Sequence, residues 1–372
     1  MKRDAAKSKR TRQKRSSSIR CIDLFCGAGG LTHGFELEGL PVEVGVDLDP
    51  ACRHPYEANN EAAFVERSVG RLTARDLNRY FGSAKVRVLA GCAPCQPFST
   101  YTQGLDAKKD HKWGLLYEFG RLARSTRPEI ITMENVPSVG RHTVFSDFVD
   151  TLKKLKYEVW HDVVECAEYG VPQTRRRLVL LASLLGPIEM IAAKRRKPKT
   201  VKQAIGRLTP IEAGSRSPRD RLHVSSSLSR LNMRRMRASK PGGTWRNWPK
   251  SLVADCHKSD TGRTYPAVYG RMEWDKPSPT ITTQCYGFGS GRFGHPEQDR
   301  AISLREAAIL QGFPRSYAFV PRDHVVEFTT VGRLIGNAVP VGLGRAIAKS
   351  ILRHVDEANR GRSRSRKKVA NA

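Results

Sequence analysis

Long apolar runs are missing from this sequence, and none of its apolar segments approaches the length of a membrane span. The amino terminus also lacks an apolar stretch followed by a small-residue cleavage site, so no secretory signal is predicted. We find no internal repeat. These absences argue against a membrane protein and a secreted protein, and they predict a cytoplasmic, nucleoid-associated location.

Acidic residues are scarce, because 36 Asp and Glu stand against 65 Lys and Arg and give a formal net charge of +29 at pH 7. Such an excess favours polyanionic partners, since neutralised phosphates release their condensed counterions. The basic ends at residues 2–20 and 360–368 could contact phosphate or could only improve solubility. Basic runs at residues 194–199 and 230–240 lie within the predicted folded region, where a groove for nucleic acid explains them better.

The eight cysteines are expected to be reduced thiols in a chain without a secretory signal. Cys92 and Cys95 form a C-x-x-C pair, but the small-domain context of a thioredoxin-type redox pair is missing. A zinc site would need a second pair with suitable spacing, which is also missing, so we expect no metal. The interpretation that remains makes Cys95 a nucleophile and Cys92 a small residue at the end of a strand.

Short apolar segments separated by helix-length stretches predict an α/β protein with a doubly wound, mostly parallel sheet. An amphipathic helix is expected over residues 143–155, and Ser303 and Glu306 have the spacing of a helix-capping box. A last helix is expected after Pro340. The expected strands are residues 20–25, 42–46, 86–90 and 129–133, and a helix is expected at residues 33–40.

Changes in composition predict the domain organisation. A smaller, loop-rich second domain is indicated by basic clusters and by proline and glycine turns that interrupt any long periodicity. The predicted segments are a basic disordered arm at 1–18, a catalytic and cofactor-binding domain at 19–193, a target-recognition domain at 194–294, a return to the catalytic domain at 295–354, and a basic tail at 355–372.

Glycines follow the first predicted strand within residues 23–30, and Asp47 ends the second. Backbone N–H groups at such a turn can approach a ligand at a helix amino terminus, and the carboxylate can accept hydrogen bonds from ribose hydroxyls. The arrangement suits a nucleoside cofactor. A tight turn, however, needs glycine for steric reasons alone.

Residues 91–99 follow the third predicted strand, at the carboxyl edge where open α/β sheets bind ligands. The run Pro94-Cys95-Gln96, with residues 23–30 before it, resembles the bacterial type of the cytosine-5 DNA methyltransferase family. Further motifs match in the family's order, and the resemblance spans residues 19–352. These motifs are residues 134–136, 173–177, 305–314 and 336–340.

The resemblance implies a Rossmann-like enzyme that transfers a methyl group from S-adenosyl-L-methionine to carbon 5 of a flipped-out cytosine in a specific double-stranded DNA sequence. It assigns Cys95 to carbon 6 of the base and a protonated Glu134 to ring nitrogen 3. Arg177 would contact the exocyclic oxygen, Arg175 the region around the thiolate, and Asn135 would orient Glu134. Taken alone, Glu134 could cap a helix and the arginines could contact phosphate.

The family's cofactor site carries over onto this chain residue by residue. Phe25 would stack on adenine, Asp47 would bind the ribose, and residues 336–340 would close the site. Where many members carry Gly-Asp-Ile, with the aspartate at the adenine amine, this chain reads Arg67-Ser68-Val69. The implied cofactor residues are Phe25, Gly27, Gly29, Gly30, Asp47, Leu48, Val69, Pro94, Asn337 and Val339.

Two other functions compete with this one. An RNA (tRNA) cytosine-5 methyltransferase shares the motif set, but its Cys-Phe-Thr signature has no counterpart near residues 285–287. A catalytically silent DNA-binding protein would not need the whole set of Cys95, Glu134, Arg175 and Arg177. We expect a monomer with a loop at residues 99–113 that closes over the flipped base. The sequence leaves the biological role open between partner of a restriction endonuclease, solitary methylase and phage-borne protection.

Overall fold

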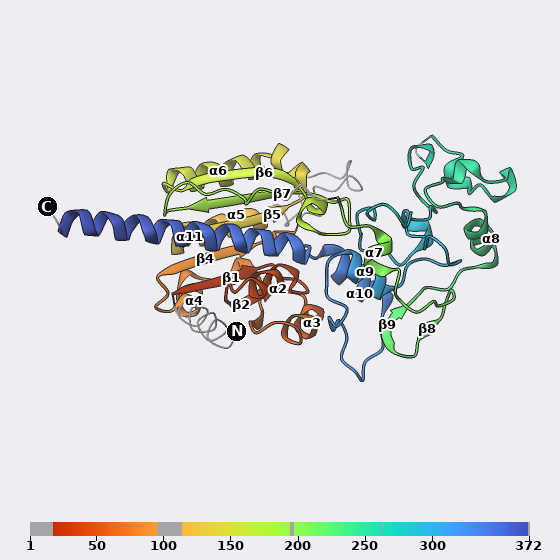
Figure 1. Ribbon diagram of the computed structural model, residues 1–372, viewed down its shortest axis with the longest axis horizontal. Coiled ribbons are helices and arrows are strands. Elements are labelled where there is room, and N and C mark those ends of the chain that lie inside the picture. Colours follow the sequence, from red (N-terminus) through yellow and green to blue (C-terminus); the bar gives the residue numbers. More distant parts are fainter. Residues whose placement is uncertain (1–17, 95–113, 194–196, 261, 371–372) are drawn as a thin grey trace. The chain divides into compact units, whose positions relative to one another are not determined.

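The computed structural model describes residues 18–94, 114–193, 197–260 and 262–370, with side chains described as far as residue 361. The chain forms two compact units (Figure 1). The first consists of Met1–Glu165, Arg176–Ala193 and Val341–Ala372, and the second of Cys166–Arg175 and Lys194–Pro340. Among the described residues, no helix combines the length and the apolar character that crossing a membrane requires.

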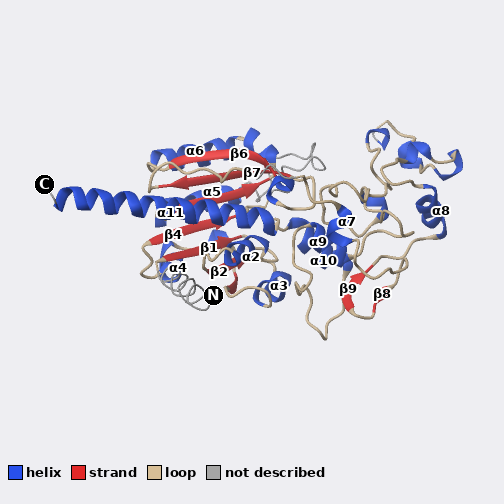
Figure 2. Ribbon diagram, viewed as in Figure 1, coloured by secondary structure: helices blue, strands red, loops and turns tan. Residues whose placement is uncertain are grey.

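The first unit is built on a seven-stranded sheet of order β3-β2-β1-β4-β5-β7-β6 (Figure 2). The strands β3, β2, β1, β4 and β5 are parallel, whereas β7 runs antiparallel to β5 and β6 antiparallel to β7. The predicted doubly wound, mostly parallel sheet is therefore confirmed. The strands are β1 (Ile19–Leu24), β2 (Val42–Asp47), β3 (Ala63–Glu66), β4 (Val86–Gly91), β5 (Ile130–Asn135), β6 (Glu158–Glu165) and β7 (Arg176–Ser183).

Helices cover both faces of this sheet. On one face, α4 (Ala74–Phe81), α5 (Gly114–Thr126) and α6 (Thr143–Lys154) pack on alternate strand residues and form the main apolar core. The other face is covered by α2 (Gly30–Leu37) and α11 (Val341–Ala370). Two hydrogen bonds fix that face, from Thr32 to Asp23 at 2.7 Å and between Ser183 and His354 at 2.7 Å. The short helix α3 (Arg53–Glu57) lies between β2 and β3 in the chain.

The second unit contains little regular structure. It holds α7 (Val201–Ile205), the hairpin of β8 (Arg216–Ser217) and β9 (Asp220–Val224), α8 (Arg230–Ala238), α9 (Leu304–Leu310) and α10 (Phe328–Asn337). The predicted capping box is confirmed at the start of α9, where the Ser303 hydroxyl accepts from the Glu306 N–H at 3.1 Å and Glu306 accepts from the Ser303 N–H at 2.7 Å.

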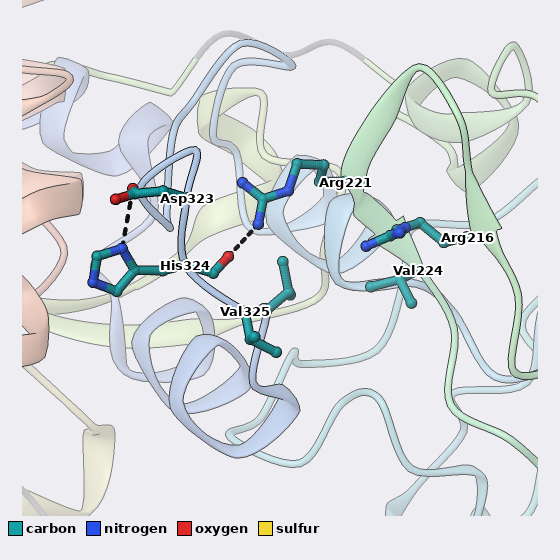
Figure 3. Close-up of a pocket in the computed structure, with 7 residues that line it drawn as sticks. Arg216, Arg221, Val224, Asp323, His324 and Val325 are labelled. Atoms are coloured by element: carbon teal, nitrogen blue, oxygen red, sulfur yellow. Dashed lines mark hydrogen bonds and ion pairs between the residues drawn. The ribbon is translucent and has the colours of Figure 1, made fainter.

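Arginines fasten the hairpin to its neighbours within this unit. Arg305 of α9 pairs with Asp220 at 2.6 Å. Arg221 donates to the carbonyls of Pro321, Arg322 and His324. A pocket of about 240 Å³ lies between the hairpin and the loop that contains residues 321–326 (Figure 3). Its lining includes Arg216, Arg221, Val224 and Asp323–Val326. None of the predicted site residues lines it.

Two boundaries differ from those expected. The second unit reaches Pro340 and includes Cys166–Arg175, because α9 packs with α7 and β9, and α10 packs with α9. Helix α11 runs to Ala370, so residues 355–370 of the predicted basic tail continue a helix instead of beginning after it. No proline interrupts that segment, and Arg, Lys, Glu and Ala favour helix.

Candidate active site

The register of the central strands brings the predicted motifs to one edge of the sheet. Leu24, the last residue of β1, lies beside Gly91 of β4, and Gly91 lies beside Met133 of β5. The residues after these strands therefore leave the sheet at the same level. The Cys92 N–H donates to the Leu24 carbonyl at 3.2 Å, which joins the first two of these segments.

The turn after β1 has an unusual backbone. Gly27 and Gly29 have φ values of 52° and 85°, in the left-handed region that favours glycine. Phe25 has φ 58°, which is rare for a bulky side chain and typical of functional sites. The turn leads directly into α2, which begins at Gly30, so the N–H groups at the amino end of that helix lie at the edge of the sheet.

Asp47, at the end of β2, holds the glycine turn. Its Oδ2 accepts from the Gly27 N–H at 2.9 Å and its Oδ1 from the Asp49 N–H at 3.0 Å. Burial raises the pKa of Asp47, although these hydrogen bonds act in the opposite direction. Leu48, the next residue, exposes 67% of its surface, which leaves an apolar side chain open beside the carboxylate.

Asp23 is a buried carboxyl in the same region that the sequence did not single out as a site residue. Its Oδ2 accepts from the Thr32 hydroxyl at 2.7 Å, and Thr32 also lies 2.9 Å from the Tyr56 hydroxyl. Its Oδ1 is buried without a hydrogen-bond partner among the described residues. Burial raises the pKa of Asp23 to about 7. The sequence signal available for this residue was an acidic side chain inside an apolar strand, four residues before the first glycine of the turn.

Glu134 is a buried carboxyl near the end of β5, with 3% of its surface exposed. The Arg177 Nε lies 3.0 Å from Glu134 Oε1, and the Cys92 thiol donates to Oε2 at 3.0 Å. Antiparallel pairing of β7 with β5 is what brings Arg177 to Glu134. Cys92, expected only to be small, thus has a polar partner.

Asn135 ties the β4 end to the β5 end. Its Nδ2 donates to the Ala93 carbonyl at 3.1 Å and its Oδ1 accepts from the Val136 N–H at 2.9 Å. The side chain is buried. Asn135 therefore fixes the backbone immediately before Pro94, which is half-buried. Cys95 and the predicted loop at 99–113 lie outside the described residues.

Arg175, Asn337 and Val339 belong to the second unit. Arg175 is buried, and its guanidinium donates to the carbonyls of Ile281 at 3.0 Å and Gly336 at 3.2 Å. Gly336 must be glycine, since a Cβ there would lie 2.3 Å from the Thr282 carbonyl carbon. Asn337 is exposed and Val339 buried.

The segment of the predicted adenine contact follows β3. Val69 is buried in the main core, whereas Ser68 is half-buried and precedes a single turn of 3-10 helix. The Ser68 carbonyl accepts from the Arg71 N–H at 3.0 Å, which closes that turn. Val69 therefore contributes apolar surface, and Ser68 stands where many members have a carboxylate.

Comparison with known proteins identifies the family. Residues 19–353 match the family of C-5 cytosine-specific DNA methylases. The chain belongs to this family. It is therefore an enzyme that methylates carbon 5 of cytosine in DNA, as the motifs predicted.

Sequence similarity to known relatives extends over nearly the whole methylase. The Type II methylase M.HgiDII of Herpetosiphon aurantiacus is 52% identical over 340 residues, which cover 90% of this chain and 95% of the relative. The Type II methyltransferase M1.HphI of Haemophilus parahaemolyticus is 30% identical over 345 residues, covering 90% and 87%. A solved DNA modification methyltransferase encoded in an E. coli prophage is similar in fold, with a TM-score of 0.69 at 21% identity, and 91% of this chain and 100% of that one are covered.

Proposed function

We propose that this methylase uses S-adenosyl-L-methionine to methylate a flipped cytosine in double-stranded DNA, with Cys95 as the nucleophile. The observation that supports this most is the buried Glu134, held by Arg177 and Cys92 one strand away from Pro94, the residue before Cys95. The site residues are those carried by the family motifs. For the site residues that the structure describes, the distances and hydrogen bonds given above support these roles.

The residues at the glycine turn suit an adenosine cofactor. Left-handed backbone at Gly27 and Gly29 makes room for a ligand, and a Cβ at Gly27 would meet no atom within 4 Å. Asp47 would bind the ribose hydroxyls, and exposed Leu48 would lie against the adenine of the cofactor. The buried Oδ1 of Asp23, which has no hydrogen-bond partner in the described part of the chain, fits a cationic ligand group. Bound S-adenosylmethionine would supply the electrophilic methyl group.

The chain's own residues would activate the cytosine. The Cys95 thiolate adds to carbon 6, forming an S–C6 bond and moving electron density towards carbon 5. A protonated Glu134 donates a hydrogen bond to ring nitrogen 3 and stabilises the charge that develops in the ring. After carbon 5 has taken the methyl group, it loses its proton and the S–C6 bond breaks, which regenerates the thiolate.

Contacts around Glu134 would position it for this task. Arg177, on Oε1, would hold the carboxyl group and contact the exocyclic oxygen of the base. The Cys92 thiol would hold Oε2 until a base enters. Asn135 would keep the segment before Cys95 at a fixed distance from Glu134 through its bond to Ala93. Arg175 would act near the thiolate, and Asn337 and Val339 at the cofactor.

The names of its relatives, Type II methylase and Type II methyltransferase, favour a restriction-modification role. A cognate restriction endonuclease as partner and a monomeric methylase are part of this proposal. Sequencing of methylated cytosines in DNA from cells that express the chain is expected to show 5-methylcytosine at one short sequence motif. Cells expressing Glu134→Gln are the matched control and should show at least a hundredfold less. Methylation confined to RNA, or spread over all cytosines, would contradict the proposal.

Cofactor binding provides a second test. Asp47→Ala should weaken S-adenosylmethionine binding by about tenfold to a hundredfold, since hydrogen bonds to a charged group contribute about 1.5–3 kcal/mol. Titration calorimetry and the cofactor-induced rise in Tm measure this. Asp49→Ala, which removes the same charge two residues away, should bind nearly as the wild type. Equal stabilisation of the wild type by NAD would refute the cofactor assignment.

A further inference from the structure

Helix α8 carries four arginines, and its geometry sorts them into two groups. Arg230, Arg234 and Arg237 fall within about 60° of one another around the helix axis. All three are exposed. Met236 points the opposite way and is fully buried against Phe288 and Ala301. The exposed arginines therefore form a row on the outer face of the helix.

The inner face of α8 is fastened to the unit by a buried arginine. Arg271, with 5% of its surface exposed, donates through Nη2 to the Met236 carbonyl at 3.0 Å and through Nη1 to the His295 carbonyl at 3.1 Å. At the other end of the helix, the Ser229 hydroxyl accepts from the Asn232 N–H at 3.2 Å. The helix is thus capped at its amino end and fastened to the unit near its carboxyl end, and the outer arginines project from this support.

Arg235 belongs to the inner group although it follows Arg234 directly. Its Nε donates to the Leu252 carbonyl at 2.8 Å. Its guanidinium lies 5.9 Å from the centre of the Trp248 ring and 5.5 Å from that of Tyr269. These contacts make Arg235 part of the packing beneath the helix. Neighbouring arginines in one basic run therefore have different tasks.

The surrounding segment, residues 229–270, forms a basic lobe around a small core of Trp245, Trp248 and Leu252. Its sequence contains nine Lys and Arg against two acidic residues. Both acids are already paired, Asp255 with Lys258 at 2.6 Å and Asp260 with Arg263 at 2.9 Å. No acidic side chain of the lobe is thus left to neutralise the arginines of α8.

Arg230 and Arg234 make no hydrogen bond, ion pair or ring contact with the part of the chain that the structure describes, whereas Arg237 pairs with Asp299 at 3.2 Å. Two unneutralised guanidinium groups one helical turn apart are separated by a rise of about 6 Å along the axis. This is close to the rise of two nucleotide steps, about 3.4 Å each, along the axis of the duplex. Guanidinium groups also bind phosphate bidentately.

We propose that the outer face of α8 binds the phosphate backbone of the duplex, with Arg230 and Arg234 each neutralising one phosphate. The contact positions the second unit on DNA and carries no sequence information. It rests on the proposed action on double-stranded DNA, and it names the element of the basic second unit that supplies part of the affinity.

The test measures how the Kd for a duplex containing the methylated sequence depends on salt. Because each neutralised phosphate contributes about 0.9 to the slope of log K against log salt, Arg230→Ala/Arg234→Ala should reduce the slope by about 1.8. The Tm and the methylated sequence should not change. Lys153→Ala/Lys154→Ala, which removes the same charge from exposed positions at the end of α6, should leave the slope within about 0.5 of the wild type.

A further variant distinguishes an arginine that contacts DNA from one that stabilises the fold beneath α8. Arg235→Ala should lower the Tm, because it removes the guanidinium group that packs on the rings of Trp248 and Tyr269. Arg234→Ala should leave the Tm unchanged. An unchanged slope in the double variant would overturn the proposal. So would an altered methylated sequence at unchanged slope, which would indicate contact with bases. A wild-type enzyme that neither binds nor methylates any duplex would instead refute the proposed function.

Discussion

A duplex that carries 5-fluorocytosine at the target position is expected to capture the enzyme as a covalent adduct that survives denaturing gel electrophoresis. In the proposed mechanism, the adduct would form when Cys95 adds to carbon 6 and the methyl group is transferred. It normally resolves when carbon 5 loses its proton, and fluorine cannot leave as a proton. Trapping should therefore require S-adenosylmethionine, and Cys95→Ala should abolish it.

Variants of Glu134 and Cys92 test the separate role of each side chain in this trapping experiment. Glu134→Gln should slow trapping by about a hundredfold or more, because an amide cannot deliver a proton to ring nitrogen 3. Cys92→Ala removes the thiol that donates to Glu134 Oε2 at 3.0 Å, and a few-fold loss is expected because a thiol is a weak donor. Cys92→Ser keeps a donor and should recover the rate.

The trial must use a pool of fluorinated sequences, since a single duplex can lack the recognition sequence. Methylation by Cys95→Ala would refute the nucleophile assignment. Trapping of fluorinated RNA but of no DNA in the pool would refute the DNA substrate. An equal loss in Cys92→Ala and Cys92→Ser would show that the thiol matters for packing rather than for its hydrogen bond.

The second large effect concerns stability, because the second unit buries a charged pair at the start of α9. Arg300 and Glu306 expose 0% and 1% of their surfaces. Their side chains form a two-pronged ion pair, with Nη1 to Oε2 at 2.7 Å and Nη2 to Oε1 at 2.8 Å. Glu306→Gln leaves Arg300 as a buried charge without its partner. The expected loss is about 3–5 kcal/mol of unfolding free energy.

Denaturation followed by fluorescence measures this loss, because the Trp274 ring lies 5.1 Å from the ring of His295 beside the pair. The control is Arg300→Met/Glu306→Leu, which removes both charges and should recover most of the stability. A loss below about 1 kcal/mol in Glu306→Gln, or a double variant no more stable than the single one, would contradict the prediction.

The same cluster predicts acid sensitivity. Burial alone would raise the pKa of Glu306, but Arg300 outweighs it and holds the pKa below its usual value of 4.5. Stability from this group is present above pH 4.5 and is lost as the pH falls through the lower folded pKa. Burial lowers the pKa of His295 from 6.5 to about 4, so stability also falls between these values, where only the unfolded chain takes up the proton.

Much of the fold and the order of the site were predictable from local patterns. Buried strands such as β4 and β5 appear in the sequence as short, mostly apolar runs, and the capping box of α9 needs only Ser303 and Glu306. Glycines after β1 and the Pro94-Cys95-Gln96 run mark the ends of strands. Helix α2 began three residues before its predicted start, because the helix begins within the glycine turn itself.

Partners across the sheet were not predictable, because they depend on strand order. The sequence by itself determined the family, and it marked the residues proposed as nucleophile, acid and cofactor turn, since each occupies a recognisable local motif. Only the tertiary structure decided that Arg177 and Cys92 meet at Glu134, that Arg175 holds carbonyls of its own unit, and that Arg234 faces solvent while Arg235 packs beneath α8. Those outcomes follow from the antiparallel β7 and from the rotation of one helix, which bring together side chains far apart in the chain.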